Sequence, residues 1–270
     1  MARKISRGGN MLKRVTAIAA TTMFLAASPA GAMEKLVVMI SGGFSLAYKQ
    51  VLPEFERSTG ISVTTLSGAS QGTGPKTIKS QLEQGTEVDV VILSGEGLDE
   101  LKAAGRIVDG SEMKLAEVAL GAAVRQGSAK PDISSVEALK RALTGARMVA
   151  LPGSTSGIFM KDEVFPRLGI ADKVSSKLYA RGIESTNALA AGEADLAIGP
   201  VSEQVNQPGI ELVGPLPDEV QLVQMFTASI VKTAHNPAQG KKLIDFLTSN
   251  AATTAIKNSG MLPVAGRGKP

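Results

Sequence analysis

The chain has 270 residues, with 29 lysine and arginine residues against 25 aspartate and glutamate residues. It contains no cysteine and one histidine, which excludes disulfide bonds, thiolate metal sites and histidine clusters that bind metals. Aromatic residues make up only 3% of the chain, and no RNA-binding signature is present, so we expect no nucleic-acid partner.

Residues 1–32 have the pattern of a secretory signal peptide. Five basic residues precede or border an apolar segment, and Ala30-Gly31-Ala32 fits the small-x-small cleavage rule. We therefore predict cleavage after Ala32 and a periplasmic mature protein, with translation starting at either Met1 or Met11. No acidic residue lies in this segment, so the mature chain is close to neutral. Its charge then favours neither nucleic acid nor a membrane surface as a partner.

From Glu34 onward, short apolar runs alternate with helical patterns, which predicts βαβ units and a mostly parallel sheet. The expected strands are residues 35–40, 61–66, 88–93, 148–151, 176–179 and 195–198. The expected helices are residues 46–58, 77–83, 98–104, 135–143, 158–168, 186–191, 237–248 and 251–259. Pro53 would lie in the first turns of its helix or bend it there.

Two longer apolar segments, residues 115–124 and 221–231, interrupt this alternation, and we expect them to connect two lobes. The predicted fold class is α/β with two lobes, each a mixed, mostly parallel sheet flanked by helices, and a cleft between them. The first lobe would comprise residues 33–117 and 228–270, and the second residues 118–227.

Three stretches repeat one arrangement, in which a strand is followed by glycines and hydroxyls and then by a helix. They are Ser41–Ser45, Ser67–Ser70 and Pro152–Gly157. The start of a helix offers unpaired backbone N–H groups and the positive end of the helix dipole, and serine hydroxyls add donors. Any one of these loops alone is an ordinary βα turn. Together they predict a site for a small anion built from neutral donors.

These stretches resemble the type 2 periplasmic binding proteins of ABC importers, particularly the molybdate/tungstate-binding family. The likeness covers nearly all of residues 34–264. Its most specific pieces are Ser45-Leu46, the stretch from Phe55 to Ile61, Gly68-Ala69-Ser70 with residues 78–85, residues 88–92, and the stretch from Gly192 to Gly199. The resemblance implies the type 2 fold and delivery of a small anion to an ABC permease, with contact to the membrane only through that permease.

The resemblance also assigns candidate ligand-binding residues. It places serine ligands at Ser45 and Ser70, an amide site at Ser156 and Gly157, and a further contact at Ser185 or Thr186. Phe44 stands in the first loop where the family has small alanines, and it joins the candidate set. The family's ligand-binding tyrosine has no counterpart, because its position falls near Pro200. Tyr48 either replaces that tyrosine or packs in the core.

The predicted ligand is molybdate or tungstate, and the alternative is a small organic carboxylate. Arg181 supports the carboxylate alternative. It lies in a loop before Gly182, and a guanidinium binds a carboxylate with two hydrogen bonds. We expect a monomer without enzymatic activity, cofactor or metal.

A more remote alternative is a hydrolase. Gly68-Ala69-Ser70-Gln71-Gly72 matches the G-x-S-x-G pattern, and Ser70, Asp195 and His235 occur in the chain order of a triad. Gly74-Pro75 delays the helix beyond the position that a nucleophile elbow requires, which disfavours this interpretation.

Overall fold

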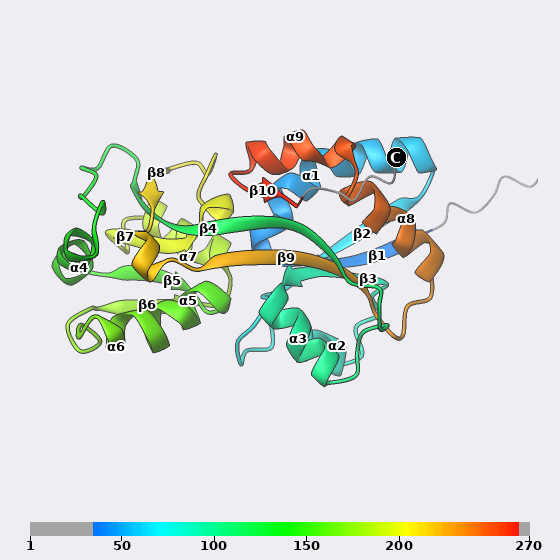
Figure 1. Ribbon diagram of the computed structural model, residues 1–270, viewed down its shortest axis with the longest axis horizontal. Coiled ribbons are helices and arrows are strands. Elements are labelled where there is room, and N and C mark those ends of the chain that lie inside the picture. The colour runs from blue at the N-terminus through cyan, green and yellow to red at the C-terminus, as the bar shows by residue number, and fades with distance from the viewer. Residues whose placement is uncertain (1–34, 265–270) are drawn as a thin grey trace, which may run out of the picture. The chain divides into compact units, whose positions relative to one another are not determined.

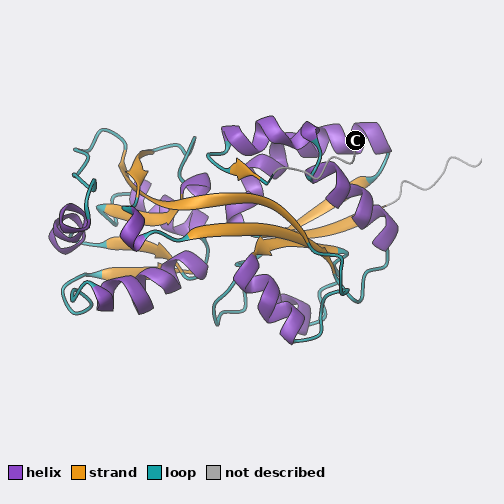
Figure 2. Ribbon diagram, viewed as in Figure 1, coloured by secondary structure: helices purple, strands orange, loops and turns teal. Residues whose placement is uncertain are grey.

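The computed structural model describes residues 35–264, so the predicted signal peptide lies outside the described residues. The described residues belong to one compact unit in which helices flank the strands of a ten-stranded sheet (Figure 2). Within residues 35–264, no helix is both long enough and apolar enough to cross a membrane.

The first lobe is built on three parallel strands in the order β2-β1-β3. These strands are β1 (Lys35–Ile40), β2 (Ser62–Ser67) and β3 (Val90–Ser94). One face carries α1 (Gly42–Thr59), α8 (Pro237–Leu247) and α9 (Asn250–Asn258), and the other carries α2 (Ile78–Glu83) and α3 (Gly95–Ala103). Alternate residues of β3 enter the two cores, so this strand is buried on both faces and its sequence is continuously apolar.

The second lobe repeats the arrangement with parallel strands in the order β7-β5-β6. These strands are β5 (Val149–Pro152), β6 (Ser176–Tyr179) and β7 (Leu196–Pro200). Its helices are α4 (Val136–Gly145), α5 (Thr155–Phe159), which continues through a π-helix (Met160–Val164) into α6 (Phe165–Arg167), and α7 (Gly182–Ala190). Two 3-10 turns, Val201–Glu203 and Asp218–Val220, follow β7 and the edge strand β8 (Ile210–Pro215).

Two long strands join the lobes, as the apolar segments predict. β4 (Met113–Arg125) pairs with β9 (Val223–Ile230) and β10 (Leu262–Pro263) in its first half and with β7 and β8 in its second half (Figure 1). The first-lobe cores draw on residues 36–118 and 226–261, and the second-lobe cores on residues 120–220. The exact lobe boundaries given above stay a prediction.

Three of the helices that begin earlier than their sequences predict have a glycine as their first residue. The helix expected from residue 46 begins at Gly42, and those expected from residues 98 and 186 begin at Gly95 and Gly182. Glycine is a poor helix former, which is why these residues were assigned to loops. Packing overrides this propensity, because each helix begins immediately beside the end of a strand. Pro53 consequently lies inside α1 rather than in its first turns, which corrects the prediction.

Two aspartates occupy equivalent places, immediately before β3 in the first lobe and β7 in the second. Asp89 is 2% exposed, and its two oxygens accept separate backbone N–H groups, those of Val37 (2.8 Å) and Asn236 (2.8 Å). Asp195 accepts the backbone N–H of Arg147 (2.7 Å) and pairs with the same residue's guanidinium at the surface. Both are structural residues.

We predict that Asp89→Asn destabilises the protein far more than Asp195→Asn. An amide has one acceptor oxygen, so at position 89 its NH2 must face a backbone N–H, at a cost of about 2–4 kcal/mol. At position 195 the amide oxygen keeps the backbone bond and loses an exposed ion pair, which costs about 1 kcal/mol or less. Chemical denaturation of the two variants measures the difference, and equal losses would contradict this account.

Candidate functional site

The carboxyl ends of the parallel strands from both lobes line one cavity of about 30 Å³, here called the serine cavity. Most of its polar wall residues follow a strand closely in the sequence, which is where α/β proteins bind ligands. Its polar walls are Ser41 after β1, Ser70 after β2, Ser154 and Ser156 after β5, Arg181 after β6, Glu203 after β7, and Gln224 on β9.

The two lobes contact each other around this cavity. The backbone N–H of Gln71 donates to Ser154 Oγ (3.2 Å), and the hydroxyls of Ser94 and Thr155 are 2.9 Å apart. Farther out, Lys76 Nζ donates to Glu184 Oε1 (2.9 Å). These contacts hold the serine cavity between the lobes in a closed arrangement.

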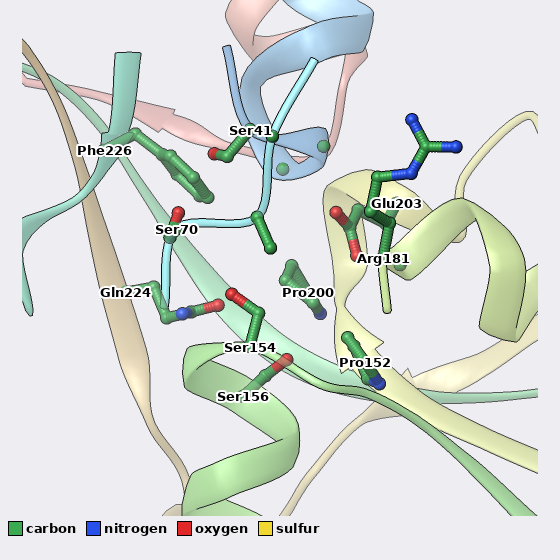
Figure 3. A pocket seen from close by; sticks show the side chains of 15 residues that line it. Ser41, Ser70, Pro152, Ser154, Ser156, Arg181, Pro200, Glu203, Gln224 and Phe226 are labelled. Atoms are coloured by element: carbon green, nitrogen blue, oxygen red, sulfur yellow. The ribbon is translucent and has the colours of Figure 1, made fainter. Parts of the chain in front are cut away.

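Several polar groups of the cavity have no partner within the described part of the chain. Ser41 Oγ and Gln224 Oε1 are buried without a hydrogen bond, although the two residues are only 3% and 2% exposed. Ser70 Oγ accepts the backbone N–H of Ser94 (3.0 Å), which leaves its own proton to donate elsewhere. In Figure 3 the polar ends of Ser154, Ser156 and Gln224 turn toward the same space. Buried polar groups are normally paired, so these groups indicate a ligand site.

Two helices of eight residues or more begin at this cavity without a side-chain cap. The N-cap residues are Ser41 for α1 and Arg181 for α7, and neither side chain bonds to the first turn of its helix. The first N–H groups of a helix have no intrahelical partner, and its N-terminus carries a partial positive charge. The cavity therefore favours an anionic group.

The Glu203 carboxyl lies between the first turns of α1 and α7. A Cβ at either Gly42 or Gly182 would overlap it, which explains why both positions are glycine. Within residues 35–264 no hydrogen bond reaches this carboxyl. Burial raises its pKa to about 7, because removal from water disfavours the ionised form.

A second cavity of about 290 Å³, here called the outer cavity, adjoins the first. Gly42, Gly68, Arg181 and Glu203 line both cavities and so mark their junction. Lys49 and Ser45 lie on the outer walls. The buried hydroxyl of Ser202, on the same wall, has no partner among the described residues.

The structure brings four predicted site residues to these cavities. Ser70, Ser156 and Arg181 line the serine cavity. Ser45 lines the outer cavity, and its hydroxyl donates to the carbonyl of Ser41 (3.0 Å) because Ser45 lies inside the first turns of α1. The Arg181 guanidinium extends away from the serine hydroxyls in Figure 3, and its Nε donates to Glu184 Oε1 (3.2 Å).

The other predicted residues lie behind the walls. Phe44 is fully buried, with its ring centroid 6.3 Å from that of Phe226, and Gly157 lets α5 begin against the carbonyl of Pro152. Ser185 and Thr186 are buried, and their hydroxyls donate to Gly182 O (2.7 and 3.4 Å). Their assignment as ligand-binding residues stays a prediction. Tyr48 is 1% exposed and packs in the core, with its hydroxyl 3.2 Å from Thr65 Oγ1.

The predicted set omits Ser41, Ser154, Glu203 and Gln224. Ser41 and Ser154 lie in two of the serine- and glycine-containing stretches of the sequence. To select them within those stretches, the first residue of each following helix must be known, and α1 begins earlier than its sequence predicts. Gln224 has a weak signal in the sequence, since it is a polar residue inside an apolar strand segment. Glu203 has no such signal, because a charged residue after a strand is usually solvated.

The hydrolase alternative finds no support in the geometry. Ser70 Oγ bonds to the Ser94 amide, Asp195 pairs with Arg147, and His235 Nε2 lies 3.7 Å from Glu87 Oε1 at the surface. None of the three triad candidates bonds to another.

Two α/β lobes joined by crossing strands, with an anion-favouring cavity between them, define a two-lobed periplasmic binding protein, and the predicted fold class is confirmed. Residues 36–262 match the model of a family described as bacterial extracellular solute-binding protein. The chain belongs to this family.

Known relatives differ in what they act on or bind. The chain is 33% identical over 258 residues to an aconitate isomerase from Pseudomonas sp, an alignment that covers 94% of this chain and 98% of the relative. The periplasmic molybdate-binding protein of Azotobacter vinelandii superposes with a TM-score of 0.65 at 20% identity, over 84% of this chain and 98% of that one. The binding protein AgtB of A. tumefaciens R10, in complex with agropinic acid, gives 0.63 at 15% identity, over 86% and 83%. The two structures show the fold alone.

We predict that the free protein loses stability as the pH rises through neutrality. The folded state of Glu203 holds its proton up to about pH 7, and the unfolded carboxyl releases it near pH 4.5. The stabilisation is therefore complete below the unfolded pKa and is lost as the pH rises through the folded one. Between about pH 5.5 and about pH 8 the loss should be about 2 kcal/mol.

Carboxyls whose pKa is lowered act in the opposite direction. The pKa of Glu184 is lowered by a hydrogen bond from Lys76, and that of Asp195 by one from Arg147, so their stabilisation is already present in this pH range. Thermal melting at both pH values measures the slope. Glu203→Gln should remove it and the exposed control Glu193→Gln should keep it, whereas an unchanged slope in Glu203→Gln would refute the assignment.

Proposed function

We propose that this chain is an extracytoplasmic binding protein for a small organic polycarboxylate of the aconitate class, which it passes to an ABC permease. The observation that carries the proposal is the pair of adjoining cavities: the serine cavity is lined mostly by neutral groups, and Lys49 and Arg181 border the outer cavity. A ligand with several carboxylate groups on a short carbon chain matches this division.

The serine cavity suits a single carboxylate group. Its volume of about 30 Å³ exceeds the ~10–15 Å³ that is needed to hold one water molecule, so it has room for one small polar group. Ser41, Ser70 and Ser156 supply hydroxyls, and α1 and α7 supply the positive ends of their dipoles. Neutral donors of this kind replace the hydration shell of an anion without adding a buried charge.

The outer cavity suits the remainder of the ligand. It holds about 290 Å³, enough for a short carbon chain, and its walls carry Lys49 and Arg181. A guanidinium binds a carboxylate with two parallel hydrogen bonds, and for this Arg181 must release or share Glu184. A polycarboxylate that spans both cavities would thus accept hydrogen bonds from the serine hydroxyls at one end and from Lys49 or Arg181 at the other.

Molybdate and tungstate fit these walls less well. A tetrahedral oxyanion has no carbon chain to occupy the outer cavity of about 290 Å³. The resemblance to molybdate-binding structures lies near 20% identity, at which only the fold is shared. The aconitate isomerase relative, at 33% identity over nearly the whole chain, supports a tricarboxylate.

Calorimetry of the mature protein tests the proposal. Heat should appear on titration with cis-aconitate or trans-aconitate and be absent with molybdate, tungstate and sulfate. Binding of molybdate with no response to any tricarboxylate would overturn it.

We predict that Arg181→Lys weakens tricarboxylate binding by about tenfold or more, because an ammonium group cannot form the bidentate pair. The control is Arg147→Lys, a surface arginine that also pairs with a carboxylate but lies outside both cavities. Calorimetric affinities should separate the two variants, and equal affinities would show that Arg181 does not hold the ligand.

A further inference from the structure

We infer that Glu203 is a catalytic acid–base residue that moves a proton between two carbons of a bound propene tricarboxylate. The chain then interconverts double-bond isomers of the ligand it binds. This inference rests on the proposed function, since it requires a tricarboxylate in the two cavities.

The position of Glu203 carries the inference. Among the described residues that line the serine and outer cavities, it supplies the only carboxyl group, and it lies at their junction with Gly42, Gly68 and Arg181. A ligand with one carboxylate in the serine cavity and the others outside places the carbons between its carboxylates at this junction. Those carbons carry the hydrogens that an allylic shift moves.

A carboxyl group at this position has no evident use in binding alone. It makes no hydrogen bond within residues 35–264, and it faces an anionic ligand that it can only repel when ionised. Two helix starts make room for it, since a side chain at Gly42 or Gly182 would occupy its place. A glutamine of the same shape would serve a binding protein better, because it would donate to the ligand. The carboxyl is what a proton transfer needs.

The reaction requires no other reactant. In its ionised form Glu203 accepts a proton from the ligand methylene, and the electron pair of that C–H bond spreads over the three-carbon unit and its attached carboxylates. The protonated Glu203 then returns the proton to the carbon at the other end of the former double bond. The double bond shifts by one position and the proton count is unchanged. If the ligand rotates about the central bond before the proton returns, the cis and trans forms are exchanged.

The surroundings suit both half-steps. The N-termini of α1 and α7 and the hydroxyls of Ser41 and Ser70 lie where negative charge develops on the carboxylates, and such preorganised donors stabilise the carbanion. The pKa of about 7 lets the same carboxyl act as base and as acid near neutral pH. The charged groups that line the outer cavity with it are Arg181, the N-cap residue of α7, and Lys49 from α1, with the Lys76–Glu184 pair beyond Arg181.

The test is proton NMR of cis-aconitate in D2O with the mature protein, together with calorimetry on the same samples. The wild type should convert cis-aconitate to trans-aconitate and exchange methylene hydrogens for deuterium. Glu203→Gln should lower both rates by about 100-fold or more, with affinity unchanged within about tenfold or improved. Glu193→Gln, a surface carboxyl outside both cavities, is the matched control and should keep the full rates.

Glu203→Asp keeps the carboxyl but shortens its reach, so it should retain more activity than Glu203→Gln; melting curves show whether each variant is folded. Wild-type protein that binds tricarboxylates but neither isomerises nor exchanges them would overturn this inference and leave the proposed function standing. Full activity in Glu203→Gln would overturn the role of the residue. Absence of any tricarboxylate binding would overturn both proposals.

Discussion

The structure depends on a gap at which two helices begin without side-chain caps, one from each lobe. Each start leaves backbone N–H groups unpaired, and the buried side chains of Ser41 and Gln224 add polar atoms without partners among the described residues. A buried polar group without a hydrogen bond costs about 1–3 kcal/mol. Several such groups at one place oppose folding unless a ligand pairs with them, which ties the stability of this arrangement to ligand binding.

The connection between the lobes determines how that ligand can act. β4 pairs with strands of both lobes and β9 runs beside its first half, so the lobes are joined by continuous strands rather than by a flexible linker. The remaining contacts around the gap are few hydrogen bonds, such as that between Ser94 and Thr155. A ligand that touches both lobes favours the closed state by the difference between its affinities for the two states. Closure around the ligand also limits the access of water to Glu203. Both ligand binding and proton transfer require this.

Most of the fold followed from the sequence, because buried parallel strands are continuously apolar and cannot be mistaken for loops. The crossing strands were placed correctly because their apolar runs are too long for an ordinary strand of this sheet. The site was predicted less completely. Ser70 and Ser156 line the serine cavity, where hydroxyls at strand ends are expected, whereas Ser45 lines the outer cavity because α1 begins four residues earlier than the sequence predicts. Their role in binding stays a prediction. Glu203 can be recognised only when distant segments meet, since a charged residue after a strand is usually solvated. Gln224 has only the weak signal of a polar residue inside an apolar strand.

The central claim is that the uncapped ends of α1 and α7 and the serine hydroxyls receive one carboxylate of a larger ligand. A crystal structure of the mature protein with trans-aconitate measures this directly. Our account predicts one carboxylate of the ligand within hydrogen-bond distance of Ser41 and Ser70 and its carbon chain beside Glu203. A tricarboxylate bound elsewhere, with the serine cavity holding only water, would contradict it.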